Sequence, residues 1–336
     1  MRFFSKANIS ATIFLCAFGV LVTLGLLQSG TIRRFSGLSL RYNEPINGQT
    51  AHRARQYSII NSESNPFWPT FWHQCWGTFS VESREVYANS ISFSGSAELV
   101  WPAEYIIGGA PSPVDRNGIA VSEALAHKLW GSIDIVGMSV YVNETPRIVR
   151  GVFKGDAELG LLSFHIEDTS QSWTAVELVG GAPHPTRSSV ESFALASGLG
   201  RPDFILMGGS MAIAYLMSIF PLIMLMVYTL VLLTRFINKH YNIASTPIFI
   251  AGLLLFAILL PFLLNTIPPW LIPTYWSNFS FWSALLHQVN ASLREFLSIN
   301  PLLRDVELKM HLIRQTWIFF LSVCCSIVLF QYIVKA

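Results

Sequence analysis

The sequence has few charged residues. Asp, Glu, Lys and Arg make up 12% of its 336 residues, about half of the roughly 25% that is usual in soluble proteins. Hydrophobic residues make up 52%, and the charges lie between long apolar runs rather than within them. This composition excludes an ordinary soluble protein and places part of the chain in lipid.

The common catalytic signatures are absent as well. The sequence has no G-x-x-x-x-G-K-[ST] loop to hold nucleotide phosphates, and neither G-x-S-x-G nor H-E-x-x-H occurs. His165, Glu167 and Asp168 lie close together, but no second histidine is spaced to complete a metal site with them. The net charge of +2 comes without a basic stripe for nucleic acid. We therefore predict no catalytic residue, no metal, no cofactor and no nucleic-acid partner, hence no enzyme.

Cysteine is scarce. Cys16, Cys324 and Cys325 lie in apolar runs, where a thiol behaves as a small hydrophobe, and only Cys75 lies in the polar part of the chain. One cysteine cannot form a disulfide within that part. We expect the polar part to be held together by its own hydrophobic core.

Four apolar stretches are long enough to cross a bilayer, which takes about 20 residues of helix. They are predicted at residues 9–28, 204–234, 244–267 and 316–334. The first also fits a signal peptide, but no clear small-x-small cleavage site follows it, so an uncleaved anchor is favoured. No ionisable side chain lies within these spans, which argues against an ion-coupled transporter.

The distribution of charge predicts the orientation. With the N-terminus in the cytoplasm, the cytoplasmic segments are residues 1–8, 235–243 and the last two residues. They carry Arg2, Lys6, Arg235, Lys239 and Lys335 and no acidic residue, as the positive-inside rule requires. We therefore predict a multi-pass protein of the cell membrane, in contact with lipid, with both termini in the cytoplasm and a large extracytoplasmic domain between the first and second spans.

That domain, residues 29–203, is predicted to be a mixed α+β fold. The aromatic residues of Asn65–Phe79 recur at helical spacing, with Asn65 as N-cap and Pro66 as first helical residue, which predicts a helix. A second external segment, residues 268–315, contains the amphipathic stretch Phe281–Leu297, predicted to be a helix that covers the second span or binds a partner.

After Gly95 the sequence carries clear signals for strands, helix caps and turns. Gly118–Val121 predicts a buried strand, Ser122 an N-cap for a helix at Glu123–Trp130, and Gly131 the end of that helix. The next predicted elements are a hairpin of Ser139–Val142 and Arg147–Val152 around a turn at Asn143-Glu144, then strands at Leu161–Glu167 and Thr174–Val179. Gly137 is predicted to adopt a turn conformation, and Gly151 to allow a close approach or a bulge.

This ordered run carries a family resemblance. Gly118–Ser132, Asp134–Asn143 and Val149–Phe153, together with the upstream Ile107-Gly108-Gly109, resemble the periplasmic core domain of MacB-type (FtsX/MacB-like) ABC transporter permeases. The order of one span, one large external domain and three further spans is also similar to that family. The resemblance implies a permease that moves external substrates, as in efflux, with a separate cytoplasmic ATPase, as a dimer and from a bacterium.

One segment departs from the family pattern. Permeases of this type carry an acidic, glycine-containing coupling helix between the second and third spans, whereas Arg235–Ser245 here contains neither acid nor glycine. Two functions remain open. The chain is either a permease or mechanotransmission subunit, with Arg235 and Lys239 as contacts to the ATPase, or a degenerate accessory, sensor or scaffold subunit that pairs with a better-preserved permease-like chain.

Overall fold

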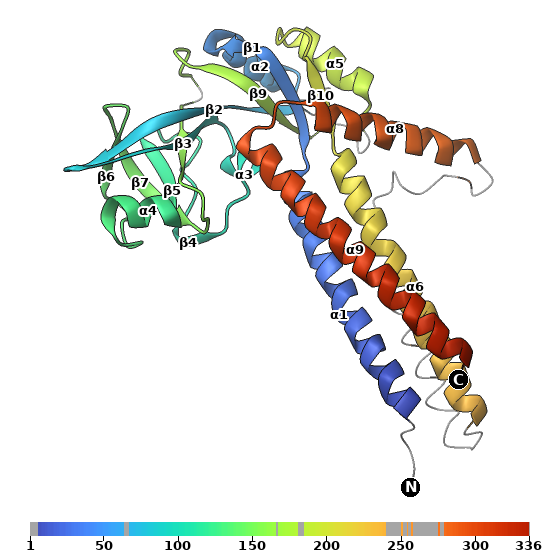
Figure 1. Ribbon diagram of the computed structural model, residues 1–336. Coiled ribbons are helices and arrows are strands. Elements are labelled where there is room, and N and C mark those ends of the chain that lie inside the picture. Colours follow the sequence, from blue (N-terminus) through green and yellow to red (C-terminus); the bar gives the residue numbers. More distant parts are fainter. Residues whose placement is uncertain are drawn as a thin grey trace. The chain divides into compact units, whose positions relative to one another are not determined.

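The computed structural model describes residues 6–63, 67–165, 167–180, 185–239 and 279–335, with the single residues 250, 254, 257 and 275. The chain forms two compact units (Figure 1). We call Arg34–Gly208 with Arg294–Val306 the sheet unit. The helical unit comprises Met1–Arg33, Gly209–Leu293 and Glu307–Ala336.

The described residues of the sheet unit form one sheet of ten strands in the order β10-β1-β9-β2-β3-β8-β5-β7-β4, with β6 bridging β2 and β7. The strands are β1 (Leu38–Asn47), β2 (Trp68–Val81), β3 (Arg84–Ser94), β4 (Tyr105–Gly108), β5 (Gly118–Ser122), β6 (Ser139–Val142), β7 (Thr145–Phe153), β8 (Leu159–Ser163), β9 (Ser172–Val179) and β10 (Phe204–Met207).

Six of these strands close into a barrel. The pairing runs β2-β3-β8-β5-β7-β6 and returns to β2, because β6 pairs with β7 on one edge and with β2 on the other. The long strand β2 takes part in both halves of the sheet: Trp68–Trp72 pair with β9, and Phe79 and Ser80 pair with β6. The three strands β9, β1 and β10 thus extend the sheet beyond the barrel.

Four helices belong to the described part of this unit: α2 (Gly48–Ile60), α3 (Ala97–Val100), α4 (Glu123–Trp130) and α5 (Arg187–Ala196). Helices α2 and α5 cover one face of the β1-β9 extension, where Ala54 and Phe193 pack with Phe71 and Val176 (Figure 1). Helix α4 closes one end of the barrel and contributes Leu125 to its apolar core.

The helix predicted at 65–79 is wrong, because this segment is strand β2; Asn65 and Pro66 lie outside the described residues. Nor do the aromatic residues form one buried face, since Trp72 is fully buried while Trp68 and Trp76 are 45% and 56% exposed. Strand β2 pairs with β3 from Phe71 to Val81, so its backbone groups are satisfied by a distant partner. Aromatic residues also favour strands, and this pairing overrides the local spacing.

The elements predicted after Gly95 are confirmed, except that the strand predicted at Leu161–Glu167 runs from Leu159 to Ser163. Strand β5 leads into α4, the hairpin β6-β7 turns at Asn143 and Glu144, and β8 and β9 follow. Both turn residues have positive φ, 46° and 67°, as a tight two-residue hairpin turn requires. These elements depend on local turn and cap chemistry, which explains why the sequence predicts them.

The helical unit contains most of α1 (Lys6–Phe35), α6 (Gly209–Lys239) and α9 (Leu303–Lys335), with the first part of α8 (Phe279–Ser298). Among the described residues, three helices are long and apolar enough to cross a membrane, at Ile13–Phe35, Gly209–Val231 and Leu303–Gln331. The predicted third span, 244–267, lies outside the described residues apart from 250, 254 and 257.

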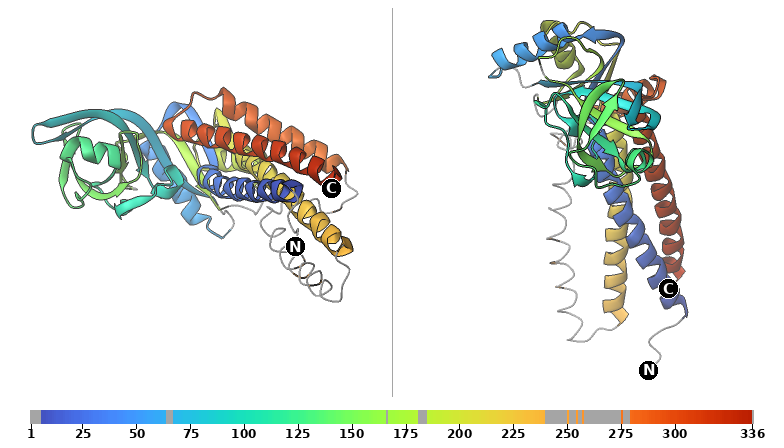
Figure 2. Two further views of the ribbon diagram at one scale, coloured as in Figure 1. Left: turned by 60° about the horizontal axis from the view of Figure 1, so that its bottom comes forward. Right: turned by 90° about the vertical axis from the view of Figure 1, so that its left-hand side faces the viewer.

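Helices α1, α6 and α9 lie side by side within this unit (Figures 1 and 2). Phe18 and Val22 of α1 pack with Tyr228 of α6 and Leu329 of α9. Ser218 of α6 donates to the Gly25 oxygen (3.1 Å) and accepts from Gln315 of α9 (2.8 Å). Such hydrogen bonds between helices stabilise association in lipid, where apolar contacts alone give little preference.

Three predicted boundaries differ from the structure. Residues 204–207 form strand β10, because they pair with β1, so the helix begins at Gly209. That helix continues to Lys239, so 235–239 are helical rather than part of a loop. The last helix begins at Leu303 instead of 316 and rises about 50 Å, well beyond a hydrocarbon core of about 30 Å. The amphipathic helix predicted at Phe281–Leu297 is confirmed as α8.

Candidate functional site

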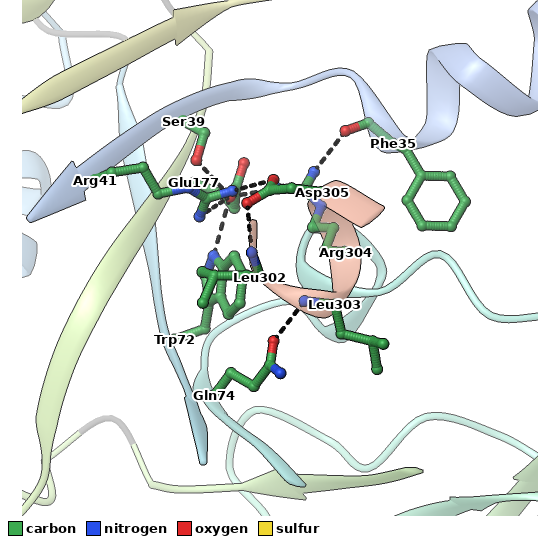
Figure 3. A network of polar contacts seen from close by, with 10 residues as sticks. All are labelled: Phe35, Ser39, Arg41, Trp72, Gln74, Glu177, Leu302, Leu303, Arg304 and Asp305. Carbon is green, nitrogen blue, oxygen red and sulfur yellow. Dashed lines mark hydrogen bonds and ion pairs between the residues drawn. The ribbon is translucent and has the colours of Figure 1, made fainter. Parts of the chain in front are cut away.

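The sheet unit buries a cluster of charged side chains where the ends of two apolar helices meet the sheet (Figure 3). We call this cluster the junction network. It consists of Ser39 and Arg41 on β1, Trp72 on β2, Glu177 on β9, and Arg304 and Asp305 in the first turn of α9.

Glu177 is the centre of the network. Its Oε1 accepts hydrogen bonds from Ser39 Oγ (2.7 Å) and Trp72 Nε1 (3.0 Å). The same oxygen pairs with Arg41 Nη1 (3.4 Å) and with Arg304 Nη1. Four donors therefore converge on one carboxylate oxygen of a side chain that is 1% exposed.

The sheet register brings these groups together. Strand β9 lies between β1 and β2, and Glu177 stands opposite Ser39 on one side and Thr70 on the other. Residues two apart on a strand point to the same face, so Arg41 and Trp72 reach the same side of the sheet as Glu177. The guanidinium of Arg41 lies 4.6 Å from the Trp72 ring centre, a cation-π distance.

The charges of the network balance. Arg41 Nη2 also pairs with Asp305 Oδ1 at 3.0 Å, so two arginines face two carboxylates. Burial alone would raise the pKa of Glu177, but Arg304 and Arg41 hold that pKa below its usual value. Glu177 thus stays ionised, because neutralising it would leave buried arginine charge without its partner at a cost of several kcal/mol.

The first turn of α9 is held by three further hydrogen bonds. Arg304 Nη2 donates to the main-chain oxygen of Phe35, the last residue of α1, at 2.9 Å. The N–H of Leu303 donates to Gln74 Oε1 of β2 (2.7 Å), and the N–H of Leu302 donates to Asp305 Oδ2 (3.2 Å). Two of the N–H groups at the start of the helix are thus bonded, one to the sheet and one to the helix itself.

Apolar contacts support the same place. Leu302 and Leu303 pack against the core that contains Trp72 and Phe93, and the Phe35 ring lies 5.8 Å from the Trp101 ring. Gly37 connects α1 to β1, and a Cβ there would lie 3.3 Å from Glu177 Oε2. The connection therefore runs close to the carboxylate with little space for a side chain.

A second ion pair fixes the end of α8. Glu295 pairs with Arg187 of α5 through both oxygens, at 2.8 and 3.3 Å, and accepts the N–H of Ile205 at 2.9 Å. Ile205 belongs to β10, which runs directly into α6. The ends of α1, α8 and α9 and the strand before α6 are thus all bonded within the sheet unit.

The glycine and serine positions nominated from the sequence lie elsewhere, around α4 and β7. Ser122 caps α4 by accepting the N–H of Leu125 (3.2 Å), and Gly131 ends the helix at φ 73°. Gly137 has φ 89°, and a Cβ on Gly151 would lie 2.4 Å from the Gly109 oxygen. None of the four contacts the junction network.

The remaining nominated residues form no catalytic or metal site in the described part of the chain. Arg235 and Lys239 belong to α6, and their side chains lie outside what the structure describes. His165 Nδ1 lies 3.8 Å from a Glu167 oxygen, while Asp168 accepts hydrogen bonds from Ser170. No group of three His, Cys, Asp or Glu that could hold a metal occurs among the described residues.

The junction residues were missed in the sequence, although a signal was present. Glu177 and Arg41 each interrupt an otherwise apolar strand, in Ala-Val-Glu-Leu-Val and Leu-Ser-Leu-Arg-Tyr. Arg304 and Asp305 stand side by side ahead of the last apolar run. Lone charges at buried strand positions indicate buried partners, but the sequence does not say which residues pair.

The described residues thus comprise a mixed α+β domain and three helices that are long and apolar enough to cross a membrane. No protein-family model and no curated protein matches the chain. Among solved structures, it is similar to the extracellular domain of YknZ, a noncanonic ABC-type transporter from Gram-positive bacteria, with 12% identity and a TM-score of 0.39 over 48% of this chain and 91% of that one. It is also similar to the periplasmic region of MacB from Actinobacillus actinomycetemcomitans, with 13% identity and a TM-score of 0.41 over 50% and 86%. MacB is also the transporter type whose periplasmic domain the run Gly118–Phe153 resembles in sequence.

Proposed function

We propose that the chain is the permease or mechanotransmission subunit of a MacB-like ABC transporter in a bacterial cell membrane. In this proposal a separate ATPase in the cytoplasm hydrolyses ATP, and the chain itself has no enzymatic activity. The sheet unit lies outside the cytoplasm and acts there on a substrate, as in efflux. The sequence resemblance of Gly118–Phe153 supports the family, and the absence of a phosphate-binding loop supports a separate ATPase.

The proposal includes four spans, with the domain of residues 29–203 between the first and second and both termini in the cytoplasm. Its support is the acid-free composition of the predicted cytoplasmic segments and the three apolar helices at Ile13–Phe35, Gly209–Val231 and Leu303–Gln331. Because four spans are few for a transport complex, we propose that two permease-like chains act as a dimer.

The junction network is the observation that carries the mechanical part of the proposal. A shift of α9 along its axis is not absorbed at its first turn, because Leu303, Arg304 and Asp305 are bonded to β2, β9 and β1. Arg304 links the same turn to the end of α1. A movement started by an ATPase at the other end of the helices would therefore reach the sheet.

A specific observation favours the second candidate, an accessory or sensor subunit that pairs with a better-preserved permease. Residues 235–245 contain neither the acid nor the glycine of the family's coupling helix. In this case the sheet unit senses or scaffolds, and another chain contacts the ATPase.

Purification from the native membrane in mild detergent separates the two candidates. Recovery of an ATPase with the chain supports the first, whereas recovery of only a second permease-like chain supports the accessory role. The double variant Arg235→Glu, Lys239→Glu locates the contact, and we expect it to lose the ATPase. Lys154→Glu, Arg201→Glu is the matched control, because both side chains are exposed in the sheet unit. Equal recovery with both variants would exclude the assigned contact.

Mechanical coupling has its own experiment. In the complex with ATPase, we expect ATP to change amide exchange in β1 and β9, and Arg304→Met to abolish this change while the ATPase stays bound. Exchange in α4, which lies away from the network, is the internal control. An ATP-dependent change in β1 and β9 that persists in the variant would exclude the network as the link.

A further inference from the structure

The barrel of the sheet unit is hollow at one end. A cavity of about 800 Å³ opens there, between the β6-β7 turn and the loops after β4 and β8. Its lining is mainly polar and includes Cys75, Ser90, Ser92, Asn143 and Arg147. Mouths of β-barrels are common ligand sites, because the surrounding strands give a rigid wall. The cavity is separate from the junction network, none of whose residues lines it.

Small side chains create this space. Ala88, Ser90 and Ser92 alternate along β3 and share the inward face, and Ala88 packs in the barrel core. Across from them lies Gly77, where a Cβ would already lie 3.3 Å from Asn143 Nδ2 and 3.6 Å from Ser90 Oγ, so a larger residue there would intrude on the mouth. At the α4 end, the equivalent space is filled by residues such as Phe79 and Leu125.

A buried cation forms part of the wall. Arg147 shares the inward face of β7 with the core residue Val149 and is only 6% exposed. Its Nη1 donates to the main-chain oxygens of Arg116 (2.6 Å) and Ser163 (2.9 Å), and its guanidinium lies 4.6 Å from the Phe164 ring centre. These contacts fix the side chain at the mouth.

Arg147 forms no ion pair with any residue that the structure describes, and its Nε has no hydrogen-bond partner among them. Asp115 and Asp168 stabilise its charge from beyond ion-pair distance, but their close partners are other groups: Asp115 pairs with Arg150 at 2.7 Å, and Asp168 accepts from Ser170 at 2.6 Å. A buried guanidinium without a carboxylate in direct contact is only partly compensated, so an anion that enters the mouth gains a strong partner.

The rim indicates what kind of anion fits. Glu167 and Asp168 line the mouth together with Arg116, so the rim carries both signs of charge and repels a polyanion such as nucleic acid. Neutral donors and acceptors, among them Asn117 and Gln171, complete the lining. One carboxylate, one ammonium group and polar groups between them match this arrangement.

We propose that the barrel mouth binds a small zwitterion of the amino-acid or short-peptide class, with its carboxylate held by Arg147 and its ammonium group by the Glu167-Asp168 rim. This site is independent of coupling to an ATPase. It gives the sheet unit a ligand of its own, whichever of the two proposed functions holds.

Protection of Cys75 from a thiol reagent tests this site, because Cys75 lines the cavity. The full chain in detergent carries Cys16→Ser, Cys324→Ser and Cys325→Ser, so that a polar maleimide reacts only with Cys75. We expect trialanine to slow the labelling at least fivefold, and trialanine amide, which lacks the carboxylate, to leave the rate unchanged. A mixture of free amino acids, used separately, distinguishes an amino-acid ligand from a peptide.

Variants complete the test. Arg147→Met should abolish protection, and Glu167→Gln, at an exposed rim position, should weaken it and remains informative if Arg147→Met fails to fold. Tyr87→Ala, at an exposed position on β3, should keep the protection. Equal protection by trialanine and its amide, protection by inorganic phosphate alone, or no protection by any probe would each overturn the proposal.

Discussion

Arg304 donates a hydrogen bond of 2.9 Å to the main-chain oxygen of Phe35, so the second residue of α9 is bonded to the last residue of α1. The same guanidinium pairs with Glu177 on β9. One side chain therefore links two apolar helices to the middle of a β-sheet. This link is the physical basis for the mechanical role proposed above.

Removing the central carboxylate should destabilise the sheet unit. Glu177→Gln leaves Arg41 and Arg304 buried with only Asp305 as counter-charge, and loss of one partner from a buried ion pair costs about 3–5 kcal/mol. We expect a clearly lower urea-unfolding midpoint for the full chain in detergent. The matched control is Glu191→Gln, which breaks the exposed Arg187–Glu191 pair and should change stability by less than about 0.5 kcal/mol. Equal midpoints for the two variants would contradict a stabilising network.

The same carboxylate predicts how stability depends on pH. Its pKa is lower in the folded protein than its usual 4.5, so the unfolded chain binds more protons in this range and stability rises with pH. The contribution of ionised Glu177 to the free energy of unfolding is complete above pH 4.5 and is lost as the pH falls toward the pKa of the folded state. The difference in unfolding midpoint between native chain and Glu177→Gln should therefore shrink below pH 4.5. A difference that stays constant down to pH 3 would show that Glu177 does not titrate with folding.

These residues also show what the sequence predicts and what it does not. Helix α4 and the β6-β7 hairpin follow from caps and turns a few residues apart, which is why they were predicted with nearly the observed bounds. Ser39 and Glu177 are 138 positions apart, and Arg41 and Asp305 are 264 apart. The register of β1 and β9 brings the first pair together, and the position of the first turn of α9 against the sheet brings the second. The prediction of a helix in place of strand β2 was wrong for the same reason: the partners of this strand are distant in sequence, and its aromatic residues recur at helical spacing.

Two glycines of the MacB-like run should differ in cost. Gly131 ends α4 at φ 73°, and a Cβ there would meet only Arg84 Nη1, at 3.9 Å, so the cost of Gly131→Ala comes mainly from the backbone conformation and is about 1 kcal/mol. At Gly151 a Cβ would lie 2.4 Å from the Gly109 oxygen and 2.6 Å from its nitrogen. The β4-β7 edge must shift, so we expect Gly151→Ala to cost about 2–3 kcal/mol. Thermal unfolding of both variants measures the order, and a larger loss for Gly131→Ala would contradict it.

The end of α8 offers a local test at β10. Glu295 accepts the N–H of Ile205 at 2.9 Å and holds Arg187 through both oxygens. Glu295→Ala removes all three hydrogen bonds, so the Ile205 amide should exchange with solvent at least tenfold faster, because β10 pairs with β1 only on its other edge. Arg187→Met is the matched control, since it removes the arginine and leaves the Glu295–Ile205 bond. Hydrogen exchange of the 204–207 segment measures the effect. If both variants exchange equally fast, the arginine and not the amide contact holds this strand in place.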